Sequence, residues 1–381
     1  MQNSRDRVVR GARKANAGSR APRAVIVLTL LGTVVATLPI IAAVLGLRGG
    51  SPGTRTAYAS APAGEYVVVA QAGEEADTVF VAAASGSGSA MEIARIPHLR
   101  GYSATGTVSP DGRRLALVVA EGGTPVRPVA SLYVLDLGSA AVARVANGVD
   151  HLQAAVWARD GRSIYFTRTA ESGNPVTRAA VWRANAGGGS EEEVLSFEGV
   201  LGVFVVGPDA SGRLVSVVID SRGSTAYRDG TIAAHLSTQI TRDWELSPDG
   251  ESMAFIESDA TSGLRYRAKT VALGEGIATG GVAAQFAGDG QQLGVSWKPG
   301  SDAPTFGQEP AGADGGVTAQ AAASGFDVPL AYSPGGGRLA VQRWTGPSFE
   351  RPGNVVLELV AEDGSRTPLP EYTRFYGWAV R

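Results

Sequence analysis

The sequence predicts an all-β fold, a seven-bladed β-propeller that follows one transmembrane helix. Three observations predict the propeller. A turn motif recurs along the chain, each interval holds about four short strand-like runs, and the last run resembles the strand missing from the first interval. Propeller blades are four-stranded sheets repeated around a central axis. Six or eight blades are also compatible with the sequence, because the repeat at residues 200–241 is weak.

The recurring motif is clearest at Ser109-Pro110-Asp111-Gly112, which leads into the apolar run Leu115-Ala116-Leu117. Further copies stand at Ala158–Gly161, Gly207–Asp209, Ser247–Gly250, Ala287–Gly290 and Ser333–Gly336. The aspartate positions are 49, 49, 40, 40 and 46 residues apart, the size of one blade. In all six copies a small residue begins the motif, an apolar residue precedes it and an aliphatic residue follows. Three matching columns indicate a true repeat.

One repeat unit can be understood physically. An apolar strand ends in a small residue, Pro presets φ for a turn, and Asp-Gly supplies the positive φ of a tight hairpin. Further strand patterns follow at residues 131–136 and 141–145. A single blade cannot bury both of its faces, so it must stack on neighbours.

The two ends of the repeat region predict how the ring closes. Residues 65–70, 78–84 and 91–96 read as three strands without a first strand before them. The C-terminal run Tyr376–Arg381 has the pattern of a first strand, with Trp378 in the apolar column and Ala379 in the small one. We therefore expect N- and C-terminal strand exchange within one blade, and a propeller domain over residues 65–381.

The N-terminal region predicts the location of the domain. Residues 1–23 form a basic tail of net charge +6, and residues 24–47 are uncharged and long enough for a membrane helix. The positive-inside rule places the tail in the cytoplasm and the propeller outside the cell membrane. A cleaved signal peptide, with a site near Ala57-Tyr58-Ala59, is the alternative. Residues 48–64, rich in Gly, Ser, Pro and Ala, are predicted to be a flexible linker.

Charge and composition exclude several classes of protein. The whole chain has a net charge of −2, so the part after residue 23 carries −8. An acidic body lacks the cationic surface that phosphate contacts require, and no nucleic-acid partner is predicted. The chain has no cysteine, which excludes disulfides, thiolate nucleophiles and Cys-based metal sites.

The Ser-Pro-Asp-Gly turns followed by apolar strands resemble the WD40-like (PD40) repeats of the TolB propeller family. The resemblance covers residues 65–381 and implies the propeller fold. Typical TolB proteins have an α/β domain before the propeller, where this sequence has the apolar segment and the linker. Such propellers serve as scaffolds, as gating domains of peptidases and as enzymes, so the resemblance does not choose among these functions.

No catalytic residue, metal site or cofactor is predicted. The three histidines, His98, His151 and His235, are far apart in sequence and are interpreted as ordinary loop or strand-edge residues. The motif aspartates Asp111, Asp160, Asp209, Asp249 and Asp289 are interpreted as turn-stabilising. Trp157 and Trp378 occupy the apolar column and are interpreted as core, whereas Trp244 and Trp297 could stack a sugar or peptide.

If the propeller binds a ligand, the loops that lead from one blade into the next are the place to expect it. Nine residues of these loops are candidates for contact with a polar peptide or a partner's loop: Arg100, Tyr102, Asp150, His151, Arg242, Asp243, Asp327, Arg374 and Tyr376. Arg and Tyr are residues that protein interfaces favour. We therefore predict a module that binds a protein or peptide of the cell envelope. The alternative is a propeller enzyme, such as a metal-dependent lactonase or lyase, acting on an envelope or extracellular substrate.

Overall fold

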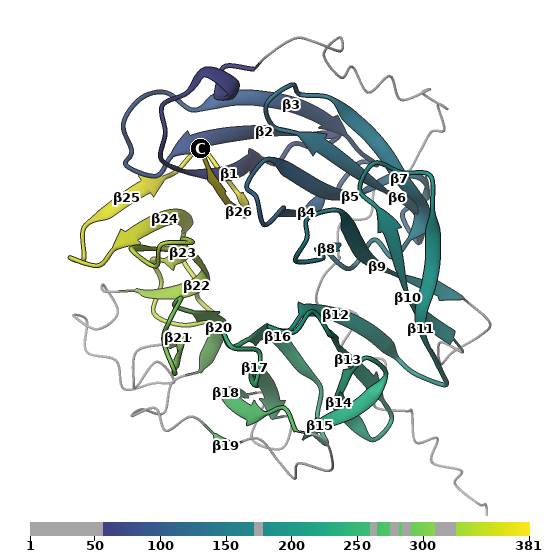
Figure 1. Cartoon of the computed structure of the whole chain (residues 1–381). Coiled ribbons are helices and arrows are strands. Elements are labelled where there is room, and N and C mark those ends of the chain that lie inside the picture. The colour runs from purple at the N-terminus through teal and green to yellow at the C-terminus, as the bar shows by residue number, and fades with distance from the viewer. Residues whose placement is uncertain (1–55, 171–177, 260–264, 275–281, 284–290, 309–324) are drawn as a thin grey trace, which may run out of the picture. The chain divides into compact units, whose positions relative to one another are not determined.

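The structure is a computed structural model that describes residues 56–381 except 171–177, 260–264, 275–281, 284–290 and 309–324. Every described residue belongs to one compact unit, Leu45–Arg381. Within it, antiparallel sheets stand around a common centre, with β4, β8, β12, β16 and β26 toward the middle (Figure 1). The unit is an all-β propeller, as the sequence predicts.

Six sheets have four strands each, and their order in space follows the order in the chain. The first two contain β4 (Thr105–Val108), β5 (Arg114–Thr124), β6 (Arg127–Asp136), β7 (Val142–Val149), and β8 (Val156–Trp157), β9 (Ser163–Ala170), β10 (Arg178–Asn185), β11 (Glu191–Glu198). The next two contain β12 (Gly202–Pro208), β13 (Leu214–Asp220), β14 (Gly223–Arg228), β15 (Thr231–Ser237), and β16 (Thr241–Leu246), β17 (Ser252–Asp259), β18 (Arg265–Ala272), β19 (Val282–Ala283).

The remaining sheets complete the ring of described strands. A two-stranded sheet contains β20 (Gln292–Trp297) and β21 (Pro304–Gln308). A four-stranded sheet contains β22 (Phe326–Tyr332), β23 (Arg338–Trp344), β24 (Val355–Ala361) and β25 (Arg366–Leu369). The last contains β26 (Arg374–Val380), β1 (Glu65–Gln71), β2 (Ala76–Ala83) and β3 (Met91–Pro97), in that order. The described residues thus form six complete blades and one sheet of two strands.

The C-terminal strand completes the N-terminal blade, as predicted. β26 runs antiparallel to β1, with Glu65 opposite Val380 and Ala70 opposite Arg374. Gly64 and Arg381 extend the ladder by exchanging two backbone hydrogen bonds of 2.8 and 3.0 Å. This pairing removes the free edges that β1 and β26 would otherwise present.

The turn aspartates stabilise the hairpins that follow the first strands. Asp111 Oδ1 accepts hydrogen bonds from the Ser109 hydroxyl at 2.5 Å and the Arg113 N–H at 3.2 Å, and Asp249 makes the equivalent contacts. Gly112 adopts a φ of 69°, which the tight turn requires and which an L-residue rarely adopts. Asp289 lies outside the described residues.

Tryptophans of the apolar column join neighbouring blades. Trp157 Nε1 donates to the Thr107 carbonyl at 2.9 Å, and Trp378 Nε1 donates to the Ala331 carbonyl at 3.2 Å. Trp297 makes the same contact with the Glu245 carbonyl at 3.2 Å. Trp297 is therefore a core residue of this column, and its predicted role in stacking a ligand is wrong.

The position of Trp297 corrects the predicted repeat in its blade. The turn after it is closed by the Ser301 N–H, which donates to the Lys298 carbonyl at 3.0 Å, just as Gly112 donates to Ser109 at 2.8 Å. The motif of this blade is therefore Lys298–Ser301. The predicted copy at Ala287–Gly290 lies outside the described residues. Asp-Gly favours any tight turn, so this pair alone does not identify the blade's motif.

Asp209 also lies at a different place in the repeat from the one predicted. Its carbonyl accepts the 2.9 Å turn bond from Gly212, so Asp209 stands in the small-residue column, two positions before the expected one. Its buried carboxylate still caps the turn, because Oδ1 accepts the N–H groups of Ser211 and Arg213 at 2.9 Å each. Arg228 of β14, 8% exposed, pairs with the other carboxylate oxygen at 3.1 Å.

The segment before β1 packs on the propeller, although residues 48–64 are predicted to be a flexible linker. A short 3₁₀ turn, η2 (Tyr58–Ser60), places the ring of Tyr58 edge-on to Tyr66 at 5.4 Å, and Tyr58 is buried. Thr56 donates its N–H and its hydroxyl to the Gly138 and Leu137 carbonyls, both at 2.8 Å. We call residues 56–61 the N-terminal strap.

No helix in the described part of the chain is long and apolar enough to cross a membrane. The predicted tail, residues 1–23, and the predicted membrane helix, residues 24–47, lie outside the described residues. Both stay predictions.

Candidate functional site

The loops that enter the first strand of each blade lie on one face of the ring, because all the first strands run in the same direction along the axis. The described loops of this kind are residues 98–104, 150–155, 199–201, 238–240 and 370–373. The turns between second and third strands lie on the same face. For example, the Gly101 N–H donates to the carbonyl of Glu74, in such a turn, at 2.8 Å. We call this side the loop face.

Tyr102 and His151 come together on the loop face. Their rings lie 5.7 Å apart in an edge-on arrangement, and the Tyr102 hydroxyl donates to the Pro125 carbonyl at 2.5 Å. Val126, which follows Pro125, is 89% exposed, and Leu152, which follows His151, is 67% exposed. We call Tyr102, Val126, His151 and Leu152 the apolar group. It joins two inter-blade loops to the tip of the β5–β6 hairpin.

Asp150 shapes the loop that carries His151 and Leu152. Its Oδ1 accepts the Leu152 N–H at 3.0 Å, and its Oδ2 accepts the Gln153 amide at 3.3 Å. Both carboxylate oxygens therefore have donors within their own loop. Asp150 therefore fixes the backbone beside the apolar group, and its carboxylate is occupied by these hydrogen bonds.

Arg100 precedes Tyr102 by two residues and pairs with Glu74. Its Nε donates to Glu74 Oε1 at 2.6 Å, and both side chains are more than half exposed. An exposed ion pair of this kind contributes little to stability, so the pair opens easily toward another ligand.

Arg242 and Asp243 form a second group on the loop face. Asp243 adopts a φ of 54° at a bulge between β16 and β17, a left-handed conformation that costs about 1 kcal/mol or more outside glycine. Its carboxylate holds Arg242 Nε at 3.1 Å, and the Arg242 guanidinium stacks over the Tyr266 ring at 5.3 Å. Backbone strain and a stacked arginine are features that functional sites share.

Asp327 belongs to an ion-pair network within its own blade. Arg343 of β23 and Arg366 of β25 lie 3.3 and 2.8 Å from its Oδ1, and Arg366 also pairs with Glu358 at 2.5 Å. The carboxylates of Asp327 and Glu358 raise the pKa of Arg366 above its usual value. Asp327 is therefore engaged across its sheet.

Arg374 and Tyr376 stand at the start of β26. Arg374 is exposed, but Tyr376 is buried, and its hydroxyl donates to the Ala104 carbonyl at 3.3 Å. Burial raises the pKa of Tyr376, so the phenol is neutral over the physiological range. Tyr376 is predicted as a contact residue, but its bulge position turns the ring into the core between blades.

Beside Tyr376 lies a buried pair that the sequence interpretation missed. His98 Nε2 lies 3.1 Å from Asp77 Oδ1, and both side chains are fully buried. Burial by itself lowers the pKa of His98, but hydrogen bonds to Asp77 and to the Leu99 carbonyl outweigh it and raise the pKa above its usual value. Asp77 at the first positions of a strand, before a Thr-Val-Phe-Val run, was the available signal.

The nine predicted residues do not form one site. The structure brings Tyr102 to His151, and Arg242 to Asp243 and Tyr266. Among the described residues, no hydrogen bond, ion pair or ring contact links these two groups to each other or to Asp327. The exposure of Val126 and Leu152 was not expected, because isolated Val and Leu residues in loops do not differ in sequence from buried ones.

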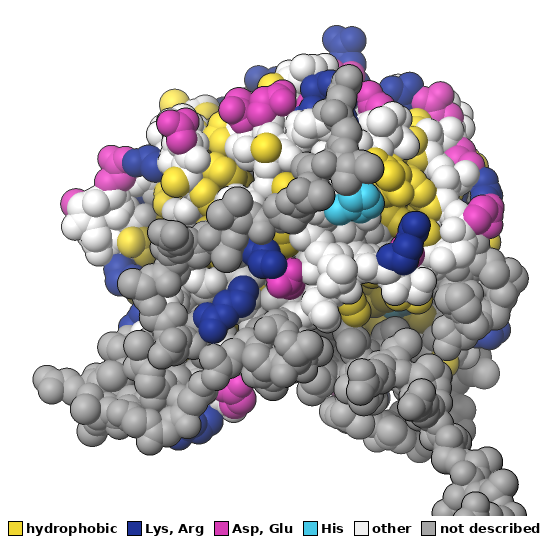
Figure 2. All heavy atoms as spheres, turned by 90° about the horizontal axis from the view of Figure 1, so that it is seen from below, with side chains coloured by type: hydrophobic (Ala, Val, Ile, Leu, Met, Phe, Trp, Pro, Cys, Tyr) yellow, Lys and Arg dark blue, Asp and Glu magenta, His cyan; other side chains and the backbone are white. Residues whose placement is uncertain are grey.

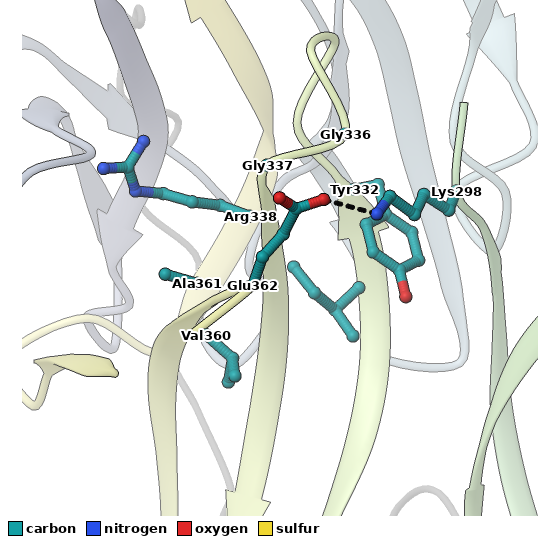
Figure 3. Close-up of a pocket in the computed structure, with 9 residues that line it drawn as sticks. Lys298, Tyr332, Gly336, Gly337, Arg338, Val360, Ala361 and Glu362 are labelled. Carbon is teal, nitrogen blue, oxygen red and sulfur yellow. Dashed lines mark hydrogen bonds and ion pairs between the residues drawn. The ribbon is translucent and has the colours of Figure 1, made fainter. Parts of the chain in front are cut away.

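Groups of His, Asp and Glu that could hold a metal do not occur in the described part of the chain. A cavity of about 280 Å³ lies by the first-to-second strand turns, where Lys298 pairs with Glu362 at 2.5 Å beside Tyr332 and Arg338 (Figure 3). It is slightly below the usual range of small-molecule pockets, about 300–1,000 Å³. On the face drawn in Figure 2, described side chains of both charge signs are interspersed.

Comparisons with known proteins support no assignment beyond the fold. No family model matches the chain, and no curated protein matches it. Among solved structures it is similar to TolB from Acinetobacter baumannii, with 17% identity, a TM-score of 0.49, and coverage of 83% of this chain and 66% of that one. This chain thus spans just under two thirds of that TolB.

Two further solved structures have lower TM-scores. A putative TolB from Agrobacterium tumefaciens has 15% identity, a TM-score of 0.45, and coverage of 84% and 92%. Dihydro-heme d1 dehydrogenase NirN in complex with DHE has 14% identity, a TM-score of 0.45, and coverage of 85% and 77%. Similarities this low carry no argument about function, so the propeller assignment depends on the strand pairing described above.

Proposed function

We propose that this protein is a binding module, a seven-bladed propeller that holds a partner protein on its loop face. One observation carries the proposal: Val126 and Leu152 are strongly exposed and directly follow Pro125 and His151, the two residues that Tyr102 contacts. Apolar groups that gather on a surface mark interaction sites more often than scattered ones do. Arg242, stacked on Tyr266, adds the kind of residue that interfaces favour.

Hydrogen bonds hold the segments that carry the apolar group. The Tyr102 hydroxyl is fixed by Pro125, and Asp150 fixes the turn before Leu152. A preorganised apolar group loses less side-chain entropy on binding than a mobile one. We expect the partner to place apolar side chains against Val126 and Leu152.

We further propose that the module is anchored in the cell membrane and that the propeller lies outside the cytoplasm, with an envelope protein or peptide as its partner. The uncharged residues 24–47 and the basic tail 1–23 support this orientation. A reporter enzyme that is active only outside the cytoplasm, fused after residue 381, should be active. An inactive reporter on a folded chain would contradict the orientation.

The enzyme alternative has its own test. A metal-dependent propeller enzyme should retain a stoichiometric divalent ion through purification of the full chain, and elemental analysis would detect it. We rank the binding module first because the apolar group supports recognition, whereas no described cluster supports chemistry.

Photo-crosslinking from the apolar group tests the binding proposal. A photoreactive residue is placed at position 126 or 152 of the full chain in its native membrane. Matched controls carry it at positions 355 and 380, where Val355 and Val380 are also exposed but belong to β24 and β26. The proposal predicts one partner protein captured from both test positions and from neither control.

Substitution then measures how much the apolar group contributes. Leu152→Ser should weaken the purified complex by about tenfold, since removing a buried contact residue costs about 1–2 kcal/mol. Val355→Ser should leave it unchanged. Capture from all four positions alike, or a complex indifferent to Leu152→Ser, would refute the proposed surface.

A further inference from the structure

The buried pair of Asp77 and His98 lies directly beneath the proposed binding surface. Asp77 belongs to β2, and His98 begins the loop 98–104 that carries Tyr102. Both side chains are fully buried, so their hydrogen bonds are made within the protein. An ionisable pair without access to water is costly unless its charges and donors are matched.

The ring of His98 needs a proton on each nitrogen. Nδ1 lies 2.9 Å from the Leu99 carbonyl oxygen, which can only accept, and Nε2 lies 3.1 Å from Asp77 Oδ1. Asp77 also accepts the Ala104 N–H at 2.8 Å and the Gly73 N–H at 3.3 Å, as a carboxylate does. This arrangement of acceptors fits an imidazolium paired with a carboxylate.

The pair holds both ends of the loop. Asp77 binds His98 at the first residue and the Ala104 backbone at the last. Between them, the Leu99 N–H donates to Ala120 at 2.6 Å and the Gly101 N–H to Glu74 at 2.8 Å. Tyr102 therefore reaches Pro125 and His151 only while the loop keeps this shape.

We propose that His98 and Asp77 form a proton-dependent latch, which holds loop 98–104 and Tyr102 in the binding surface while His98 is protonated and loosens them when it is not. Loss of the proton removes the donor that His98 supplies to either the Leu99 carbonyl or the Asp77 carboxylate. The Leu99 carbonyl then keeps the Tyr102 N–H at 2.9 Å, and Asp77 keeps the N–H groups of Ala104 and Gly73. A buried polar network that loses one of its hydrogen bonds is weakened. This inference rests on the proposed function in one respect, that loop 98–104 carries part of the binding surface.

The direction of the pH dependence follows from the groups around the pair. Asp77 favours the imidazolium, Arg374 of β26 opposes it, and neutral Tyr376 adds no charge. Glu74, Glu75 and Arg100 flank the loop at the surface. The pKa of His98 is higher in the folded than in the unfolded chain, so the latch's full contribution is present at pH below about 6.5. It is lost as pH rises through the folded value.

Imidazole NMR of the full chain tests the latch without any partner. The chain has three histidines, so His151→Gln and His235→Gln assign the third ring to His98 by elimination. We expect this ring to carry protons on both nitrogens at pH 6 and to lose one of them only at a pH above the ordinary pKa of histidine. A His98 ring with a single proton at pH 6 would overturn the proposal.

Hydrogen exchange of loop 98–104, corrected for intrinsic rates, supplies the second measurement. Protection should fall by up to about tenfold for each unit by which the pKa of His98 in the folded chain exceeds its unfolded value. The fall should have the same midpoint pH as the NMR titration. His98→Gln should abolish the pH step, and His235→Gln should leave it in place. A pH step that persists in His98→Gln would also overturn the latch. So would a change in protection whose midpoint pH differs from that of the His98 NMR titration. Neither readout needs the partner, so failure of the latch is distinct from failure of the proposed function.

Discussion

Gly335 stands where the turn motif has an aspartate. The carboxylate that this turn lacks is supplied by Glu65. The ideal Cβ position of Gly335 lies 3.2 Å from Oε1 of Glu65, which belongs to the adjoining blade. Oε2 of Glu65 pairs with Arg338 at 3.2 Å. The carboxylate that Asp111 and Asp249 supply within their own turns is thus replaced here by one that crosses between blades.

Restoring the aspartate should therefore destabilise the protein. Gly335→Asp would place a second carboxylate against Glu65, and like charges this close disfavour each other. We expect the free energy of unfolding to fall by about 1–2 kcal/mol, measured by urea denaturation. Gly335→Asn, equal in size and uncharged, should cost less, and Glu65→Gln should reduce the effect of Gly335→Asp. A stabilised Gly335→Asp variant would show that hydrogen bonds of the new aspartate within the turn outweigh its repulsion with Glu65.

At the scale of the strand, the seam between β16 and β20 contains a carboxyl group with an unusual titration. Glu245 Oε1 accepts the Trp297 N–H at 3.4 Å, while the Trp297 indole binds the Glu245 carbonyl. Burial raises the pKa of Glu245 to about 8, and the Trp297 N–H opposes the rise. The folded chain therefore holds a proton between pH 5 and 8 that the unfolded chain has lost.

Stability should fall over this range as pH rises, and Glu245→Gln should remove that fall. Gln keeps the acceptor for Trp297 and cannot ionise. We expect equal stability of the two proteins at pH 5 and an advantage for the variant at pH 8 on the order of 2 kcal/mol. Thermal unfolding at both values measures it, with exposed Glu362→Gln as the control. Parallel pH profiles of the two proteins would mean that Glu245 ionises as freely as in water.

The strand pattern was also the scale at which the sequence predicted most and erred most. Strand ends at residues 65–70, 78–84 and 91–96 agree with β1, β2 and β3 within a few residues, because Gly or Pro residues bound each apolar run. The repeat was misplaced at Asp209 and at Ala287–Gly290, since Asp and Gly favour turns wherever they occur. Trp297 was the better marker, because its indole has a fixed partner in the next blade.

For the whole molecule, the sequence predicted the closure but not the site. Closure depends on a missing strand at one end and a surplus strand at the other, and both are visible in the order of residues. The pairing of Asp77 with His98 and the contact of Tyr102 with His151 arise where separate loops meet in space. Neither local propensity nor repeat spacing contains that information.

The N-terminal strap gives the closure a second support that belongs to the molecule as a whole. Thr56 binds the turn between β6 and β7, Tyr58 packs on Tyr66 of β1, and Arg381 donates to the Ala59 carbonyl. The strap thus joins the first and last described segments of the propeller to the next blade. If the chain is anchored through residues 24–47, a force applied from the membrane acts on this strap before it acts on β1.

Tyr58→Ala should therefore weaken the whole propeller. Removing a buried aromatic side chain costs about 3–5 kcal/mol, reduced here because the strap can partly relax. We expect the free energy of unfolding to fall by about 2–3 kcal/mol, with β1 and β26 exchanging amide hydrogens faster than β9 and β10. Tyr58→Phe keeps the ring and should cost under about 1 kcal/mol, because no described group binds the Tyr58 hydroxyl. Tyr372→Ala, only partly buried, controls for the loss of any tyrosine. An unchanged stability of Tyr58→Ala would mean that residues 56–61 behave as the flexible linker that their composition predicts.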